Sequence, residues 1–157
     1  MKKLFLTFDG RISRRAFWTG LVLLVIGAIA GAALYVAAIS MDAFLGAPKG
    51  SRSNAIAVLI IYLLLFAPYL ALLVKRLHDR GKSGWWSMVF FVPQYFYAFG
   101  DAMGLSAIIG FSNLFHYLSG SLYAAATIWM LVELGLLKGQ EGGNRYGTDP
   151  LEPGATE

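Results

Sequence analysis

The chain has 157 residues, of which 57% are hydrophobic and only 14% are charged, with a formal net charge of +4. Soluble domains average about a quarter charged residues, and the apolar residues here fall in long uncharged runs, so a water-soluble core cannot bury them. The absence of cysteine excludes a disulfide framework, a thiolate metal site and a thiol nucleophile. The composition predicts one all-α integral membrane domain.

The first apolar run predicts a membrane span over 16–41. These 26 residues carry no charge, which is enough to cross about 30 Å of hydrocarbon at about 1.5 Å per residue. A basic flank precedes them, as in a signal peptide, but the run exceeds the roughly 7–15 apolar residues of such a peptide. We therefore expect an uncleaved anchor. Gly27 and Gly31 form a GxxxG pattern, which predicts close helix packing, either within the chain or in a homo-oligomer.

Two further spans follow, over 55–74 and 85–100. The earlier one has 20 uncharged residues, ends before Lys75, and contains Pro68 as an expected kink. The later one has only 16 uncharged residues, with Pro93 in its middle. This length is short for a span, so the sequence does not fix the residue at which its outer end lies.

The fourth span is predicted over 114–137, and its single charged residue is Glu133. The stretch before it, 101–113, indicates an external loop or a short interfacial helix. After residue 137 no apolar period remains, and 151–157 is expected to be disordered. Together the spans predict a four-helix bundle within a single domain, 1–150.

The positive-inside rule gives the orientation. With four spans, eleven of the thirteen Lys and Arg residues share a side with the termini. These are Lys2, Lys3, Arg11, Arg14, Arg15, Lys75, Arg76, Arg80, Lys82, Lys138 and Arg145. Both termini are therefore predicted to be cytoplasmic. The rule alone also permits three spans, but 85–137 is too long for one helix.

Two predicted cytoplasmic segments look alike. Asp9 to Arg15 and Asp79 to Gly84 each combine an acid, a glycine and bases with a serine, and each leads to tryptophan. Ser13 and Ser83 are expected to cap helices, while the indoles anchor at the headgroups. This structural interpretation is favoured over a specific ligand site.

The remaining motifs give no catalytic or metal site. Gly81-Lys82-Ser83 resembles the end of a phosphate-binding loop, but Arg76 stands where that loop needs glycine. His78 and Asp79 are adjacent, and neighbours in sequence do not face each other on a helix. His116 is expected at the opposite membrane face. We predict a non-enzymatic protein with no cofactor.

Glu133 is the one acid inside an apolar run, and such a residue is a functional candidate by default. It lies about 7.5 Å from the inner boundary by helical rise, within reach of Arg76, Arg14 or another cytoplasmic base. A structural ion pair is favoured over a proton relay, because transport chains usually contain several intramembrane acids.

Three stretches carry a family resemblance: Phe8 to Arg14, Arg76 to Trp86 and Gly143 to Pro150. They resemble the bacterial inner-membrane family called domain of unknown function eight hundred and five, the YhaH and YhaI type. The resemblance implies a small multi-span protein of the bacterial inner membrane and brings no established activity. Thr148 stands where the family pattern usually has proline, which should loosen that turn.

All three stretches would lie on the cytoplasmic surface, where Asp79 is expected to pair with a base such as Arg145 or Arg14. We predict that this basic face binds anionic lipid headgroups or a protein partner and no nucleic acid. The candidate contact residues are Arg11, Arg14, Arg15, Arg76, His78, Asp79, Arg80, Lys82, Trp85, Trp86, Asn144, Arg145 and Tyr146. The alternative is a small transporter or channel subunit that uses Glu133, and a membrane enzyme ranks third.

Overall fold

The computed structural model describes residues 2–44, 52–99, 104 and 112–152. Regular structure in these residues is helical, apart from one isolated bridge between Asn144 and Gly147. The elements are α1 (Lys2–Leu6), α2 (Arg14–Phe44), α3 (Arg52–Asp79), a 3-10 helix η1 (Gly84–Ser87), α4 (Met88–Phe99), α6 (Ser112–Met130) and a π-helix η2 (Leu131–Leu136). The all-α prediction is therefore confirmed.

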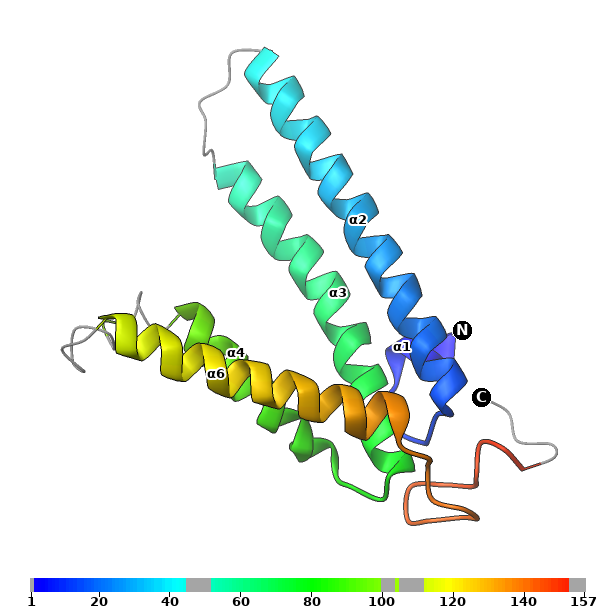
Figure 1. Cartoon of the computed structure of the whole chain (residues 1–157). Helices are drawn as coiled ribbons and strands as arrows, with labels where there is room; N and C mark the ends of the chain where they lie inside the picture. The colour runs from blue at the N-terminus through cyan, green and yellow to red at the C-terminus, as the bar shows by residue number, and fades with distance from the viewer. Residues whose placement is uncertain (1, 45–51, 100–103, 105–111, 153–157) are drawn as a thin grey trace.

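The helices form two hairpins that meet at one end and diverge from it (Figure 1). In one hairpin α2 lies beside α3, and in the other α4 lies beside α6. We name the shared end the junction: it comprises residues 2–20 up to the first turns of α2, residues 69–91 from the end of α3 to the start of α4, and residues 129–152 from the end of α6 onward. A compact four-helix bundle is not confirmed, because the backbones of the two hairpins separate away from the junction.

Among the described residues, three helices are long and apolar enough to cross a membrane: Arg14–Ala37, Ile60–Asp79 and Leu114–Leu136. The second predicted span, 55–74, lies within α3, which continues through Lys75 and Arg76 to Asp79; the membrane boundaries of this span stay a prediction. The α-helical part of the third predicted span, α4, has only 12 residues, or about 18 Å at 1.5 Å per residue. Its expected outer end lies outside the described residues, so a fourth span stays a prediction.

The hydrophobic core lies at the junction. Its buried members are Ile12, Phe17, Leu72, Leu73, Leu77, Phe90, Phe91, Met130 and Leu134. Away from the junction the helices expose large apolar side chains, such as Leu34 at 72% and Leu64 at 67%. An apolar surface of this extent is unfavourable in water and suits contact with lipid.

Small residues bring α2 against α3. A Cβ atom added to Gly20 would lie 2.8 Å from Leu72 Cδ2, and one added to Gly31 would lie 3.3 Å from Ile61 Cγ2. Gly27 likewise faces Leu65. The GxxxG pattern therefore serves packing within the chain, one of the two alternatives left by the sequence, and homo-oligomerisation stays a prediction.

The two serine caps have different outcomes. Ser13 Oγ accepts a hydrogen bond from the Ala16 amide at 3.2 Å, which caps α2 as predicted. Ser83 makes no side-chain cap bond, so the second cap was wrong. The loop is shaped instead by Gly81, which has a φ of +71°. The Gly81 and Lys82 amides donate to the carbonyls of His78 and Leu77, the glycine-requiring motif that ends many helices.

The segment after η2 is folded against the junction at least as far as Glu152. Asn144 and Gly147 exchange backbone hydrogen bonds of 2.9 and 3.0 Å. Leu151 and Glu152, predicted to be disordered, form a turn in which their amides donate to Asp149. The rest of the predicted tail, 153–157, lies outside the described residues.

Candidate functional site

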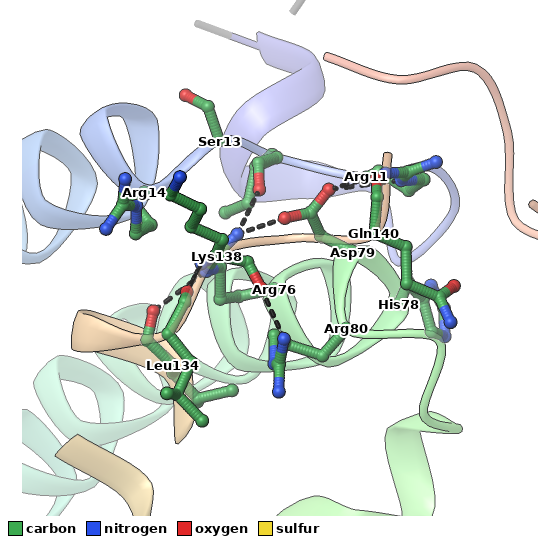
Figure 2. A network of polar contacts seen from close by, with 12 residues as sticks. Arg11, Ser13, Arg14, Arg76, His78, Asp79, Arg80, Leu134, Lys138 and Gln140 are labelled. Carbon is green, nitrogen blue, oxygen red and sulfur yellow. Dashed lines mark hydrogen bonds and ion pairs between the residues drawn. The ribbon is translucent and has the colours of Figure 1, made fainter. Parts of the chain in front are cut away.

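A buried ion cluster lies at the centre of the junction (Figure 2). One carboxylate oxygen of Asp79 accepts from Arg11 Nε at 3.1 Å, and the other is paired with Arg76. Side-chain exposure is 1% for each arginine and 4% for Asp79. The sequence predicted that a base would pair with Asp79 but named the wrong ones: Arg145 and Arg14 lie elsewhere.

The junction arginines also bind the carbonyl end of η2. Helix ends leave their last carbonyls without intrahelical partners, and cationic side chains are favourable there. Arg76 donates to the carbonyls of Leu134 at 2.8 Å and Leu137 at 2.6 Å, and Arg14 donates to that of Leu136 at 3.0 Å. Arg80 donates to the carbonyl of Lys138.

Trp18 reaches the same helix end from α2. Its indole Nε1 donates to the Gly135 carbonyl at 3.2 Å, and its ring stays 39% exposed. Both tryptophan-bearing segments noted in the sequence therefore hold one helix terminus, the first through Arg14 and Trp18 and the second through Arg80.

Glu133 forms a structural ion pair, as predicted. Its partners are Arg80 and Lys82, and not Arg76 or Arg14, the two bases that the sequence analysis named. Its Oε1 atom lies 3.0 Å from Arg80 Nε and 3.0 Å from Lys82 Nζ, and its side chain is 8% exposed. Lys82 Nζ also stands 5.0 Å from the ring centre of Trp86 and 5.2 Å from that of Trp129, a cation-π arrangement. These contacts join the loop after α3 to the second hairpin.

The segment after η2 is fixed to the junction by side chains from all three family stretches. Asn144 Nδ2 donates to the His78 carbonyl at 3.0 Å, and the His78 and Tyr146 rings stack with centres 3.8 Å apart. Arg145 lies over Tyr146 at 4.7 Å. His78 thus faces Tyr146 and the Gly10 carbonyl; it forms no acid-base pair with Asp79. Residues of the three family stretches therefore meet at the junction.

Arg11 and Asp149 complete the attachment. Arg11 donates to the carbonyls of Gln140 and Gly142, both at 2.5 Å. The Asp149 carboxylate accepts from the amides of Leu151 and Gly142, each at 3.0 Å. These backbone bonds, that from Leu151 first, hold the pKa of Asp149 below its usual value.

A cavity of about 570 Å³ opens beside this cluster. Exposed Arg14, Arg15 and Lys138 contribute cations to its wall, and Trp18 contributes an indole. The full lining is Ser13, Arg14, Arg15, Trp18, Arg76, Asp79, Gly135, Lys138, Gly139, Gln140, Glu141, Asp149, Pro150 and Leu151. In the described part of the chain, no group of three or more His, Asp or Glu side chains is arranged to hold a metal ion.

The model of the family "Protein of unknown function (DUF805)" matches residues 5–148 of this sequence. The chain belongs to the DUF805 family. It is 31% identical to the Inner membrane protein YhaI of Escherichia coli K12 over 150 residues, covering 94% of this chain and 89% of that protein. It is also 31% identical to YiiR of the same strain over 144 residues, or 91% and 85% of the two chains. No solved structure matches the chain.

A third relative, the Inner membrane protein YhaH of Escherichia coli K12, is 29% identical over 91 residues, or 58% of this chain and 69% of that protein. Two of these relatives are named as inner membrane proteins, and in the part of this chain that the structure describes three helices are long and apolar enough to span a membrane. The chain is therefore a multi-pass protein of the bacterial inner membrane.

Of the residues that line the cavity, only Arg14, Arg15, Arg76 and Asp79 were among the contact residues predicted from the sequence; Trp18, Lys138 and Gln140 are among those that were missed. Trp18 could have been included, because it follows the Arg14-Arg15 pair by one helical turn. No local signal marks Lys138 or Gln140, since their positions depend on how the chain folds back after η2. Trp85, in contrast, was selected and lies outside the cavity, with 79% of its surface exposed.

Replacing Gly135 with alanine should destabilise this DUF805 protein by about 1–3 kcal/mol. The new Cβ would lie 2.6 Å from Trp18 Cζ2, so the indole must move and its hydrogen bond to the Gly135 carbonyl must weaken. The loss of stability is measured as a lower unfolding temperature in detergent, with intrinsic fluorescence as the probe of unfolding. Gly27→Ala is the matched control, because its Cβ would meet Leu65 at an ordinary 3.6 Å. Equal unfolding temperatures for both variants would contradict this account.

Proposed function

We propose that this protein is a non-enzymatic four-span membrane protein whose basic junction faces the cytoplasm and binds anionic lipid headgroups. The location of the junction elements supports the orientation. The start of α2, the end of α3 and the end of η2 lie together at one end, beside α1 and the segment 137–152 (Figure 1). This end carries eleven of the thirteen Lys and Arg residues, as the positive-inside rule requires of a cytoplasmic face.

The exposed cations of the junction carry the lipid proposal. The side chains of Arg11 and Arg76 are engaged in buried contacts, whereas Arg15, Lys138 and Arg145 are exposed. Within the described part of the chain none of these three forms an ion pair. Basic side chains close to the cytoplasmic leaflet each contribute about 1 kcal/mol of attraction to anionic lipid.

The titratable groups have structural partners, which supports a non-enzymatic role. Asp79 is held by two arginines, Glu133 by Arg80 and Lys82, and His78 by Tyr146 and the Gly10 carbonyl. A general acid or base must reach a proton of the substrate. The side chains of Asp79, Glu133 and His78 are instead engaged in contacts within the protein. The pairing of Glu133 also weakens the alternative of a proton-coupled transporter.

The proposal predicts that anionic lipid stabilises the purified protein more than zwitterionic lipid does. A ligand that binds only the folded state raises its stability in proportion to the logarithm of its concentration. The measurement is thermal unfolding in detergent with added short-chain phosphatidylglycerol or phosphatidylcholine. The difference should shrink from 50 mM to 500 mM salt, because salt screens exposed charges. Equal unfolding temperatures in the two lipids at low salt would refute lipid binding and favour a protein partner for this face.

A further inference from the structure

We infer that the cavity at the junction binds the phosphate of one anionic glycerophospholipid, whose acyl chains run along α2. This inference rests on the proposed function and places the lipid-binding site at the cavity. Of the exposed bases of the junction, Arg14, Arg15 and Lys138 form this site. Its volume of about 570 Å³ falls within the range of small-molecule pockets, about 300–1,000 Å³.

The cations approach the cavity from two directions. Arg14 and Arg15 come from the first turn of α2, and Lys138 comes from the backbone that leaves η2. One nitrogen of Arg14 donates to the Leu136 carbonyl, and a guanidinium carries five N–H donors. The positive end of the α2 dipole adds to the attraction for an anion. Figure 2 shows Arg14 and Lys138 beside the cluster of Arg76 and Asp79.

The three acids of the lining oppose this attraction only partly. Asp79 is neutralised by Arg11 and Arg76, with one arginine on each carboxylate oxygen. Asp149 is turned to the amides of Gly142 and Leu151. Glu141 is exposed, and water screens a charge of that kind. Local cationic charge therefore remains around Arg14, Arg15 and Lys138.

A lipid fits better than a free phosphate because an apolar strip continues from Trp18, which lines the cavity. Trp18, Val22, Ile26 and Ile29 recur at spacings of four, four and three residues on α2, so they share one helix face. Their exposed fractions are 39%, 54%, 57% and 65%. An indole at the headgroup level with an aliphatic surface beyond it is the expected environment of a lipid that straddles the interface.

The test compares the double variant Arg15→Gln/Lys138→Gln with Arg52→Gln, which removes a base at the end of α3 away from the junction. Binding is measured by native mass spectrometry and by the unfolding temperature during titration with short-chain phosphatidylglycerol. The double variant should need about 30-fold more lipid for half-saturation, which corresponds to about 2 kcal/mol for two bases. Arg52→Gln should bind within about twofold of the wild type. Monodisperse elution and unchanged helicity establish that each variant is folded.

The outcomes separate this inference from the proposed function. If the wild type prefers phosphatidylglycerol and the double variant keeps that preference, the cavity assignment is wrong and the general lipid role stands. If the wild type has no preference, the proposed function itself fails. Glycerol 3-phosphate and inorganic phosphate are titrated in parallel, and stabilisation by either at the lipid's concentration would overturn the choice of a lipid.

The acyl-chain position has a separate readout. A phosphatidylglycerol with a diazirine in its acyl chain should label α2 between Val22 and Ile29 after irradiation, as located by peptide mass spectrometry. Labelling there should fall in the double variant, since the headgroup no longer anchors the chain. Equal labelling of the exposed faces of α2 and α6 would indicate bulk lipid contact and overturn the proposed path.

Discussion

Replacing Asp79 with asparagine should lower the free energy of unfolding by about 3–5 kcal/mol. Its carboxylate is 4% exposed and is shared by Arg11 and Arg76, each 1% exposed. Asparagine keeps the shape of the side chain and removes its charge, so two buried guanidinium groups lose their only ion-pair partner in the described part of the chain. Thermal or denaturant unfolding in detergent should report the loss, and Asp79→Lys should prevent folding.

Glu141→Gln is the matched control for this prediction. It removes the same charge at the same end of the molecule, but Glu141 is exposed, and such substitutions usually change stability by less than about 0.5 kcal/mol. If Asp79→Asn melts at the temperature of Glu141→Gln, the cluster is not what joins the two hairpins.

The long helices could be predicted from the sequence because hydrocarbon imposes a simple rule on uncharged runs. The run 16–41 lies inside α2, and the run 114–137 corresponds closely to α6 and η2. The same rule ended the second span at Lys75, where charge begins. The helix itself continues to Asp79, because Lys and Arg are good helix formers, so charge that ends an uncharged run does not end the helix.

The sequence predicted which types of residue form the site and on which surface they lie, but not which residues pair. The sequence gathered the bases, Asp79 and the segment around Asn144 on one surface, because topology fixes the side of every loop. It could not choose Arg11 for Asp79, since 68 residues separate the pair and the choice depends on how the hairpins meet. The π-helical turn at Leu131–Leu136 and the short α1 also have no clear local signal.

Many of the bases proposed as lipid contacts have another role. Arg11, Arg76 and Arg80 donate to backbone carbonyls and carboxylates inside the junction, and so hold the second hairpin and the following segment in place. Part of the positive charge at this end therefore stabilises the fold. Composition alone cannot show which bases do so, because exposed Arg14 also donates to the Leu136 carbonyl.

Replacing Glu133 with glutamine should lower the free energy of unfolding by about 2 kcal/mol and reduce the folded yield in detergent. Hydrogen bonds to charged groups contribute about 1.5–3 kcal/mol each, and Glu133 Oε1 accepts from Arg80 and Lys82 at 3.0 Å. Those cations are 24% and 30% exposed, so water offsets part of the loss. Unfolding temperature and the monodisperse fraction after gel filtration measure the effect.

A double-mutant cycle with Lys82→Gln distinguishes a structural ion pair from a transport residue. If the pair is structural, the double variant should be more stable than the sum of the single losses predicts, because each single change already breaks the contact. Flux into proteoliposomes is measured on the same preparations. Wild-type stability in Glu133→Gln, combined with the loss of a protein-dependent flux, would overturn the structural role and restore the transporter hypothesis, because an intramembrane acid that contributes nothing to folding is retained for its chemistry.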